Sequence, residues 1–147
     1  MIVQNKNIEK MCSFYVSEYH LEMILVPFIN KKIEEKENVI INTEYNLEDS
    51  LEVLLSKMNL KKENKEKILN LGWNVDSDKE IKDKSNVIII GNKNYIDDVN
   101  GKILQNDIDN VTIVDCYNIE EMKSDISNVV NNYDCNLNTT GFEKMKL

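Results

Sequence analysis

The sequence predicts a single α/β domain in which a mostly parallel sheet of four to five strands lies between two layers of helices. Short apolar, β-branched runs recur along the chain, and each is followed by a longer segment whose apolar residues have helical spacing. This alternation is typical of parallel sheets covered by helices on both faces. The length fits one domain, because 147 residues bury a sizeable core and no shift in composition divides 1–147. Flexible ends are expected at 1–10 and 138–147.

The first half of the chain contains a predicted strand, a long helix and a second strand. Residues 11–16 are apolar, aromatic and β-branched, as in a buried strand. Ser17 is the expected N-cap of a helix whose charged end lies at 31–36, and Pro27 predicts either a kink or a later start of that helix. The apolar run 39–41 is the next strand, of the kind that a parallel sheet buries on both faces.

Two further helices are predicted before the third strand. Apolar residues at helical spacing place one helix over 47–58. The next is short, with Asn64 as its N-cap and Gly72 as its C-terminal stop. Trp73 follows directly, so we expect its ring to pack over the end of this helix. The segment 74–85 is nearly all polar and is the best candidate for a mobile loop.

The second half repeats this pattern, beginning with four consecutive β-branched residues at 87–90. A helix is expected over 95–103, where Gly101 lowers helix stability by about 1 kcal/mol relative to alanine. Residues 111–114 form the next buried strand, and 115–118 are its expected exit loop.

The last helix has a predicted start signal. Asn118 and Glu121 stand three residues apart, as the N-cap and N3 positions of a capping box. The helix is expected over 119–133, and a short strand over 135–137. Together these elements predict a Rossmann-like three-layer α/β/α fold.

The charge of the chain argues against nucleic-acid binding. Its formal net charge is −8, its sequence pI is near 4.7, and it contains no arginine. Arginine supplies the planar fork that reads guanine and clamps phosphate, and the lysines at 61–67 and 79–84 are interleaved with acids. We therefore expect no nucleic-acid partner.

Cysteine usage and hydropathy indicate a cytoplasmic protein. Cys12, Cys116 and Cys135 form an odd set without CxxC spacing, and the chain has one histidine. This pattern favours reduced thiols and argues against a metal site. The N-terminus has no signal segment, and no apolar run approaches the roughly 20 residues that span a bilayer, so no membrane association is expected.

Ligands of open α/β sheets bind outside the carboxyl ends of the strands. In this chain those ends gather polar residues that could hold a small polar or anionic ligand, and tyrosines that could line a pocket for an apolar or aromatic ligand. All of them could instead be ordinary loop, cap and packing residues. They are Tyr15, Ser17, His20, Thr43, Glu44, Gly91, Asn92, Lys93, Asp115 and Tyr117. No GxGxxG follows any strand and no GxxxxGKS or GxxxxGKT occurs, so the sequence argues against a dinucleotide-binding loop or a P-loop and predicts no cofactor.

Two catalytic alternatives stay open. Cys116 could be a nucleophile at a strand exit, or a small buried hydrophobic residue; the chain lacks the arginine that would bind an oxyanion. Asp115 could bind Mg²⁺ if a partner carboxylate such as Glu44 met it, or it could cap the following helix. No residue is assigned a catalytic role on these patterns.

The segment 12–44 also resembles the opening of a known family. It begins Cys-Ser-Phe-Tyr-Val-Ser-Glu-Tyr-His, continues through Val-Pro-Phe, and ends in Val-Ile-Ile-Asn-Thr-Glu. A strand with a cysteine and an aromatic pair, an acidic turn, a helix carrying Pro-Phe and a strand after a charged loop are similar to the MEDS sensory domains. These are degenerate relatives of RecA/KaiC-type ATPases in bacterial and archaeal regulators. The resemblance implies a degenerate RecA-like fold without a P-loop and a non-catalytic sensing role.

The leading hypothesis is a bacterial, non-catalytic domain of the cytoplasm with a regulatory or small-molecule-sensing role. One alternative is an enzyme of unidentified class that uses Asp115 and Glu44 with a divalent metal, or Cys116. Another is a protein-interaction module that offers its acidic surface and its tail to a partner. The expected partners are accordingly a small-molecule ligand and a protein, including a second copy of the chain.

Overall fold

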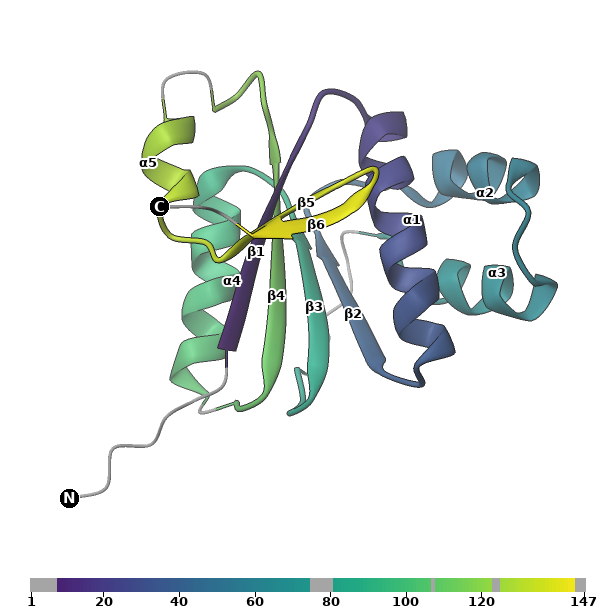
Figure 1. Ribbon diagram of the computed structural model, residues 1–147, viewed down its shortest axis with the longest axis horizontal. Helices are drawn as coiled ribbons and strands as arrows, with labels where there is room; N and C mark the ends of the chain where they lie inside the picture. Colours follow the sequence, from purple (N-terminus) through teal and green to yellow (C-terminus); the bar gives the residue numbers. More distant parts are fainter. Residues whose placement is uncertain (1–7, 75–80, 107, 123–124, 145–147) are drawn as a thin grey trace.

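A computed structural model describes residues 8–74, 81–106, 108–122 and 125–144 and shows a six-stranded sheet in the order β2-β3-β4-β1-β5-β6 (Figure 1). The strands are β1 (Ile8–Tyr15), β2 (Asn38–Thr43), β3 (Ser85–Ile90), β4 (Val111–Asn118), β5 (Cys135–Asn138) and β6 (Gly141–Lys144). The helices are α1 (Glu18–Glu34), α2 (Glu48–Lys57), α3 (Lys62–Leu69), α4 (Lys93–Gln105) and α5 (Ile126–Val130). Strands β1 to β5 are parallel, and β6 is antiparallel to β5. The predicted α/β class with a mostly parallel sheet is confirmed.

Two hydrophobic cores lie on opposite faces of the sheet, which gives the three predicted layers. Helices α1, α2 and α3 cover one face, and α4 and α5 cover the other (Figure 1). Leu25 and Ile29 of α1 pack in the first core, while Val99 and Ile103 of α4 pack in the second. Alternate residues of each strand point into one core or the other, because successive side chains of a strand project to opposite faces.

Helix α1 begins where the sequence predicts. The Oγ of Ser17 accepts a hydrogen bond from the backbone N–H of His20 at 3.1 Å, so Ser17 is the N-cap. The helix is continuous from Glu18 to Glu34 and includes Pro27, so the alternative of a later start is wrong. Pro27 is exposed, while its neighbours Val26 and Phe28 are buried. The residue that cannot donate a backbone hydrogen bond therefore sits on the side of the helix away from the core.

Asn64 is not the N-cap of α3, which is a correction. The helix begins at Lys62, and Asn64 is a buried residue inside it. Its Nδ2 donates hydrogen bonds at 3.1 Å to Asn30 Oδ1 and to Glu34 Oε1 on α1. The side chain therefore joins α3 to α1, a role that a local cap signal cannot reveal.

Trp73 packs over the end of α3 as predicted. The ring is fully buried, and its Nε1 donates a hydrogen bond at 2.7 Å to the carbonyl of Ile68. Helix α3 ends at Leu69, earlier than the predicted stop at Gly72, which has a φ of 85°. The loop predicted over 74–85 includes 75–80, which lie outside the described residues, and its last residue already begins β3.

Strand β4 is longer than predicted. It runs through Asp115, Cys116 and Tyr117 to Asn118, so residues 115–118 are not an exit loop. The strand continues past its apolar run because β1 pairs with it over its full length and β3 pairs with it as far as Cys116. Asp115 is thereby placed inside the sheet, where its exposed fraction is 0%.

The predicted last helix is also corrected. Only Ile126–Val130 is helical among the described residues of 119–133. Asn118 Oδ1 accepts a hydrogen bond from the N–H of Glu120 at 3.0 Å, which is a local Asx turn in place of the capping box expected with Glu121. A short side chain that accepts a hydrogen bond from the backbone N–H two residues later stabilises a turn, and this turn competes with helix formation.

The C-terminal segment forms a hairpin on the edge of the sheet. The predicted strand at 135–137 is present as β5, and β6 pairs with it in a segment expected to be flexible. Likewise Ile8–Lys10 of the predicted flexible N-terminus belong to β1, while 1–7 and 145–147 lie outside the described residues. No helix in the described part of the chain is long and apolar enough to cross a membrane.

Candidate functional site at the carboxyl edge of the sheet

The carboxyl ends of β1 and β4 lie side by side, and the connections that follow these two strands go to opposite faces of the sheet. Strand β1 leads into α1 on one face, and β4 leads toward α5 on the other (Figure 1). Tyr15 pairs with Asn118 at the ends of the two strands, and the N–H of Ile119 donates to the carbonyl of Tyr15 at 2.9 Å. Such a switch point is the usual ligand crevice of an open α/β sheet.

Most of the predicted ligand residues do lie at this edge. The ends of β1, β2 and β3, with the turns after them, supply Tyr15, Ser17, His20, Thr43, Glu44, Gly91, Asn92 and Lys93. Asp115 and Tyr117 differ, because both lie within β4, and Tyr117 packs in the core beneath α4 and α5. The set predicted as one site is therefore divided between an exposed edge and a buried core.

In the turn between β1 and α1, two backbone donors are used by neighbouring side chains. The N–H of Val16 donates to His20 Nδ1 at 3.0 Å, and the N–H of His20 donates to Ser17 Oγ at 3.1 Å. Because Nδ1 accepts a hydrogen bond, the neutral imidazole carries its proton on Nε2. A phosphate at a helix N-terminus binds the free N–H groups of the first turn, and one of these, the N–H of His20, already has an acceptor here.

The turn between β3 and α4 is filled by a carboxylate of the chain itself. Glu44 Oε1 accepts a hydrogen bond from the N–H of Asn92 at 2.7 Å, and Asn92 Oδ1 accepts one from the N–H of Tyr95 at 2.8 Å. Gly91 makes this approach feasible, since a Cβ there would lie 2.5 Å from the Tyr95 ring and 2.9 Å from Glu44 Oε1. Glu44 thus occupies the place where an external anion would meet the N-terminus of α4.

Acidic and phenolic side chains set the electrostatics of this edge. Burial raises the pKa of Tyr15, Tyr45 and Tyr95, and nearby carboxylates raise each of them further. The carboxylates that act on one or more of these tyrosines are Glu18, Glu44 and Glu121. The edge therefore repels anions, and Glu121 is a member of it that the sequence pattern placed only at a helix cap.

Lys93 is paired within its own helix. Its Nζ lies 2.8 Å from Asp97 Oδ2, one turn along α4, and the hydrogen bond to this carboxylate raises the pKa of Lys93. With both side chains largely exposed, the pair adds little stability, but it offsets the positive charge of this lysine at the edge.

Asp115 belongs to a second, buried cluster under α4 and α5. Asn100 Nδ2 donates to its two carboxylate oxygens at 3.0 and 3.2 Å, and the hydroxyl of Tyr133 donates to Oδ2 at 2.6 Å. Lys10 Nζ lies 3.8 Å from the same oxygen and 5.0 Å from the centre of the Tyr133 ring. Burial raises the pKa of Asp115, and these three partners partly offset the rise.

The buried cluster does not form either predicted catalytic arrangement. Glu44 contacts the N-terminus of α4, whereas Asp115 contacts Asn100, Tyr133 and Lys10. No group of three or more His, Cys, Asp or Glu side chains among the described residues could hold a metal ion. Cys116 is fully buried in the opposite core, and burial raises the pKa of its thiol well above the usual value, whereas a nucleophilic cysteine needs a lowered pKa.

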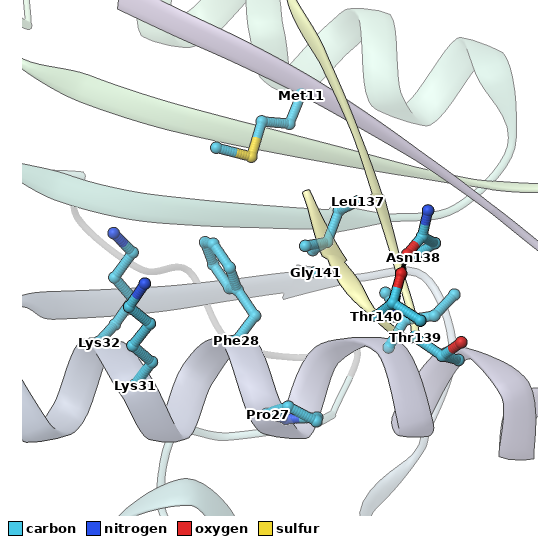
Figure 2. A pocket seen from close by; sticks show the side chains of 11 residues that line it. Met11, Pro27, Phe28, Lys31, Lys32, Leu137, Asn138, Thr139, Thr140 and Gly141 are labelled. Carbon is cyan, nitrogen blue, oxygen red and sulfur yellow. Dashed lines mark hydrogen bonds between the residues drawn. The ribbon is translucent and has the colours of Figure 1, made fainter. Parts of the chain in front are cut away.

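A cavity of about 430 Å³ lies elsewhere, between α1 and the β5–β6 hairpin (Figure 2). Its lining residues are Met11, Ile24, Pro27, Phe28, Lys31, Lys32, Leu137, Asn138, Thr139, Thr140 and Gly141. The sequence does not reveal this site, because β6 is not predicted from it. Without the β5–β6 hairpin, nothing faces the side of α1 that carries Phe28, and no cavity is expected there.

Comparison of the chain with protein-family models, with curated proteins and with solved structures finds no match in any of the three.

Proposed function

We propose that the chain is a non-catalytic regulatory domain that senses a small molecule. The observation that carries this proposal is the carboxyl edge of the sheet, where Ser17 and Glu44 accept hydrogen bonds from the backbone N–H groups of His20 and Asn92 at the starts of α1 and α4, the places where a phosphate would bind. An α/β scaffold with its usual anion site filled by its own side chains is suited to binding without phosphoryl transfer.

The resemblance of 12–44 to MEDS sensory domains supports the same role, because that family also lacks the P-loop. The cavity beside α1 supplies a place for a ligand that does not depend on the closed edge. The net charge of −8 and the absence of arginine favour a partner other than nucleic acid.

An enzyme is the less favoured alternative on this geometry. Cys116 is fully buried, and the carboxylates of Asp115 and Glu44 bind different partners. A protein-interaction module, including a homodimer, stays an alternative that the following experiment also addresses.

The test is thermal unfolding, followed by circular dichroism, of the whole chain with three groups of compounds. These are ATP and GTP with Mg²⁺, divalent metal ions alone, and a panel of small apolar and amphipathic compounds. We expect a compound of the last group to raise Tm, since ligand at a hundred times its Kd stabilises the folded state by about 2.7 kcal/mol. We expect no shift and no phosphate release with the nucleotides.

Two outcomes would contradict the proposal. Nucleotide hydrolysis that is lost in Glu44→Gln or Cys116→Ser would make the chain an enzyme. A Tm that no compound changes, together with a partner protein recovered by the intact chain and not by a chain truncated after Thr139, would make it an interaction module.

A further inference from the structure

We propose that the cavity between α1 and the β5–β6 hairpin binds a small organic anion with an apolar body, whose charged group is held by Lys31 and Lys32. The inference rests on the proposed sensing function and gives that function its class of ligand. It follows from the shape of the cavity, the distribution of polar groups in its wall and the charge of its lining.

The body of the cavity is apolar and preformed. Met11 comes from β1, Phe28 from α1 and Leu137 from β5, and Figure 2 shows these side chains facing a common space. Each is already less than 9% exposed, so their positions are fixed by the core before any ligand arrives. The volume of about 430 Å³ falls within the range of roughly 300–1,000 Å³ that is usual for small-molecule sites.

The charged part of the lining is positive. Lys31 and Lys32 line the cavity from the C-terminal half of α1, and no acidic residue is among the described residues that line it. This contrasts with the whole chain, in which 26 acidic residues outnumber 18 basic ones. A site that gathers two lysines and no carboxylate in such a protein favours an anion over a cation or a neutral molecule.

The two lysines differ in their ion pairs. Lys31 is exposed and has no ion pair with another described residue. Lys32 Nζ forms ion pairs with Glu35 at 3.7 Å and Glu37 at 3.8 Å, and lies 5.5 Å from the centre of the Phe28 ring. Lys31 is therefore the main positive charge available to a ligand that lies against Phe28, and Lys32 adds its charge where such a ligand replaces Glu35 or Glu37 as its partner.

The opposite end of the cavity is closed by the hairpin turn. Asn138 Oδ1 accepts hydrogen bonds from the backbone N–H and the hydroxyl of Thr140, at 2.9 and 2.7 Å. This turn uses its strongest acceptor internally and presents no charge to the cavity. In Figure 2 the lysines and the turn lie on opposite sides of Phe28, so the ligand would place its anionic group at the lysines and its apolar body over Phe28.

The test uses ligands that share one hydrocarbon chain and differ in the head group. Decanoate and decyl phosphate are the anions, decanol the neutral analogue and decylamine the cation, each titrated calorimetrically into the whole chain below its micelle concentration. We expect both anions to bind at least tenfold more tightly than decanol, and decylamine not to bind. The ratio of the two anions distinguishes a carboxylate from a phosphate ligand.

Variants locate the charged contact. The double variant Lys31→Met and Lys32→Met keeps the aliphatic stems and removes both charges, so we expect at least a tenfold loss of decanoate affinity with decanol affinity unchanged. Lys62→Met with Lys102→Met, on α3 and α4, is the control with the same net charge and should bind as the wild type does. Thr140→Trp, an exposed position at the cavity, should abolish binding of every probe by filling the space.

The inference is overturned if decanoate and decylamine bind equally, if no probe binds, or if the Lys31/Lys32 variant keeps full decanoate affinity. A different small molecule that raises Tm regardless of these lysines would leave the sensing role standing and show this ligand class to be wrong. Nucleotide turnover would instead overturn the proposed function itself.

Discussion

Glu44 and Asn92 close the N-terminus of α4 with a hydrogen bond of 2.7 Å between the carboxylate of one and the backbone N–H of the other. The two residues follow neighbouring strands, β2 and β3, so the contact forms only when these strands pair. A negative charge at the positive end of a helix is favourable, and here the chain provides that charge itself. The pair therefore contributes to stability and also excludes an external anion.

Removal of this carboxylate should destabilise the fold. We expect Glu44→Ala to lower the free energy of unfolding by about 1 kcal/mol, because a charge-assisted hydrogen bond and a favourable helix-terminus charge are lost at a partly exposed site. Urea denaturation followed by circular dichroism measures this. Glu52→Ala, on the exposed side of α2, is the control and should stay within about 0.5 kcal/mol of the wild type. Equal effects of the two variants would show that the Glu44 contact carries no stability.

Substitution by alanine should change stability in opposite directions at two glycines, Gly91 before α4 and Gly101 within it. At Gly91 a Cβ would lie 2.5 Å from the Tyr95 ring and 2.9 Å from Glu44 Oε1, so Gly91→Ala should destabilise by about 1–3 kcal/mol through overpacking. At Gly101 a Cβ would meet nothing within 4 Å, so Gly101→Ala should stabilise by up to about 1 kcal/mol through helix propensity. The midpoints of urea denaturation give both signs. Destabilisation by both variants would contradict the packing described at Gly101.

Local patterns were sufficient to predict the parallel strands and the fold class. The apolar run at 87–90 and the N-cap at Ser17 are properties of a few neighbouring residues, and the structure confirms both. Asp115 shows where such patterns fail. A carboxylate interrupts an apolar run, and only partners far along the chain, Asn100 and Tyr133, allow the strand to continue through it.

The candidate sites were predictable to different degrees. The residues of the carboxyl edge can be predicted from where the strands end, but the Glu44–Asn92 contact depends on a side-chain conformation that no sequence pattern encodes. The cavity beside α1 depends on β6, whose residues Gly141–Lys144 lack a β-branched run and become a strand by pairing with β5. Burial of Asn64 against α1 was unpredictable for the same reason.

Trp73 should behave as a fully buried ring with a satisfied N–H. As the chain has one tryptophan, its emission should be blue-shifted and poorly quenched by acrylamide in the folded state. Trp73→Phe should lower the free energy of unfolding by about 2–3 kcal/mol, because it leaves a smaller ring and removes the hydrogen bond to the Ile68 carbonyl. Tyr19→Phe, at an exposed aromatic position, should change stability by less than about 0.5 kcal/mol. Emission near that of free tryptophan in the native protein would contradict this placement.

Tyr133 and Tyr117 offer a graded test of the buried cluster. Tyr133 donates its single hydroxyl proton to Asp115, so Tyr117 must donate to the oxygen of Tyr133. Tyr133→Phe should therefore cost about 1–3 kcal/mol, because it removes one partner of Asp115 and leaves the buried hydroxyl of Tyr117 without its acceptor, and Tyr117→Phe about 1 kcal/mol. Chemical denaturation of both variants at neutral pH gives the order. A larger cost for Tyr117→Phe would contradict this direction of donation.

Asp115 should make the stability of the chain depend on pH in a definite direction. Its pKa in the folded state is raised above the ordinary value of 3.8, chiefly by burial. Below the ordinary value the carboxyl is protonated in both states, and the full contribution to stability is present. As pH rises through the raised folded pKa, the unfolded state loses the proton more readily, and stability is lost. The wild type should therefore lose stability relative to Asp115→Asn as pH rises from the ordinary value of 3.8 through the raised folded pKa.

The test is how the difference in the free energy of unfolding between the wild type and Asp115→Asn changes with pH. A difference that stays constant with pH reports only the altered hydrogen bonds to Asn100 and Tyr133. Urea denaturation at a series of pH values gives the free energy of unfolding of each protein, and subtraction cancels the other titrating groups. Asp98→Asn is the control, because it removes an exposed carboxylate from α4, the helix that also carries Asn100. Its free energy of unfolding should stay within about 0.5 kcal/mol of the wild type at every pH of the series. A difference for Asp115→Asn that is flat, or that favours the wild type more as pH rises, would mean that the three partners of Asp115 outweigh its burial.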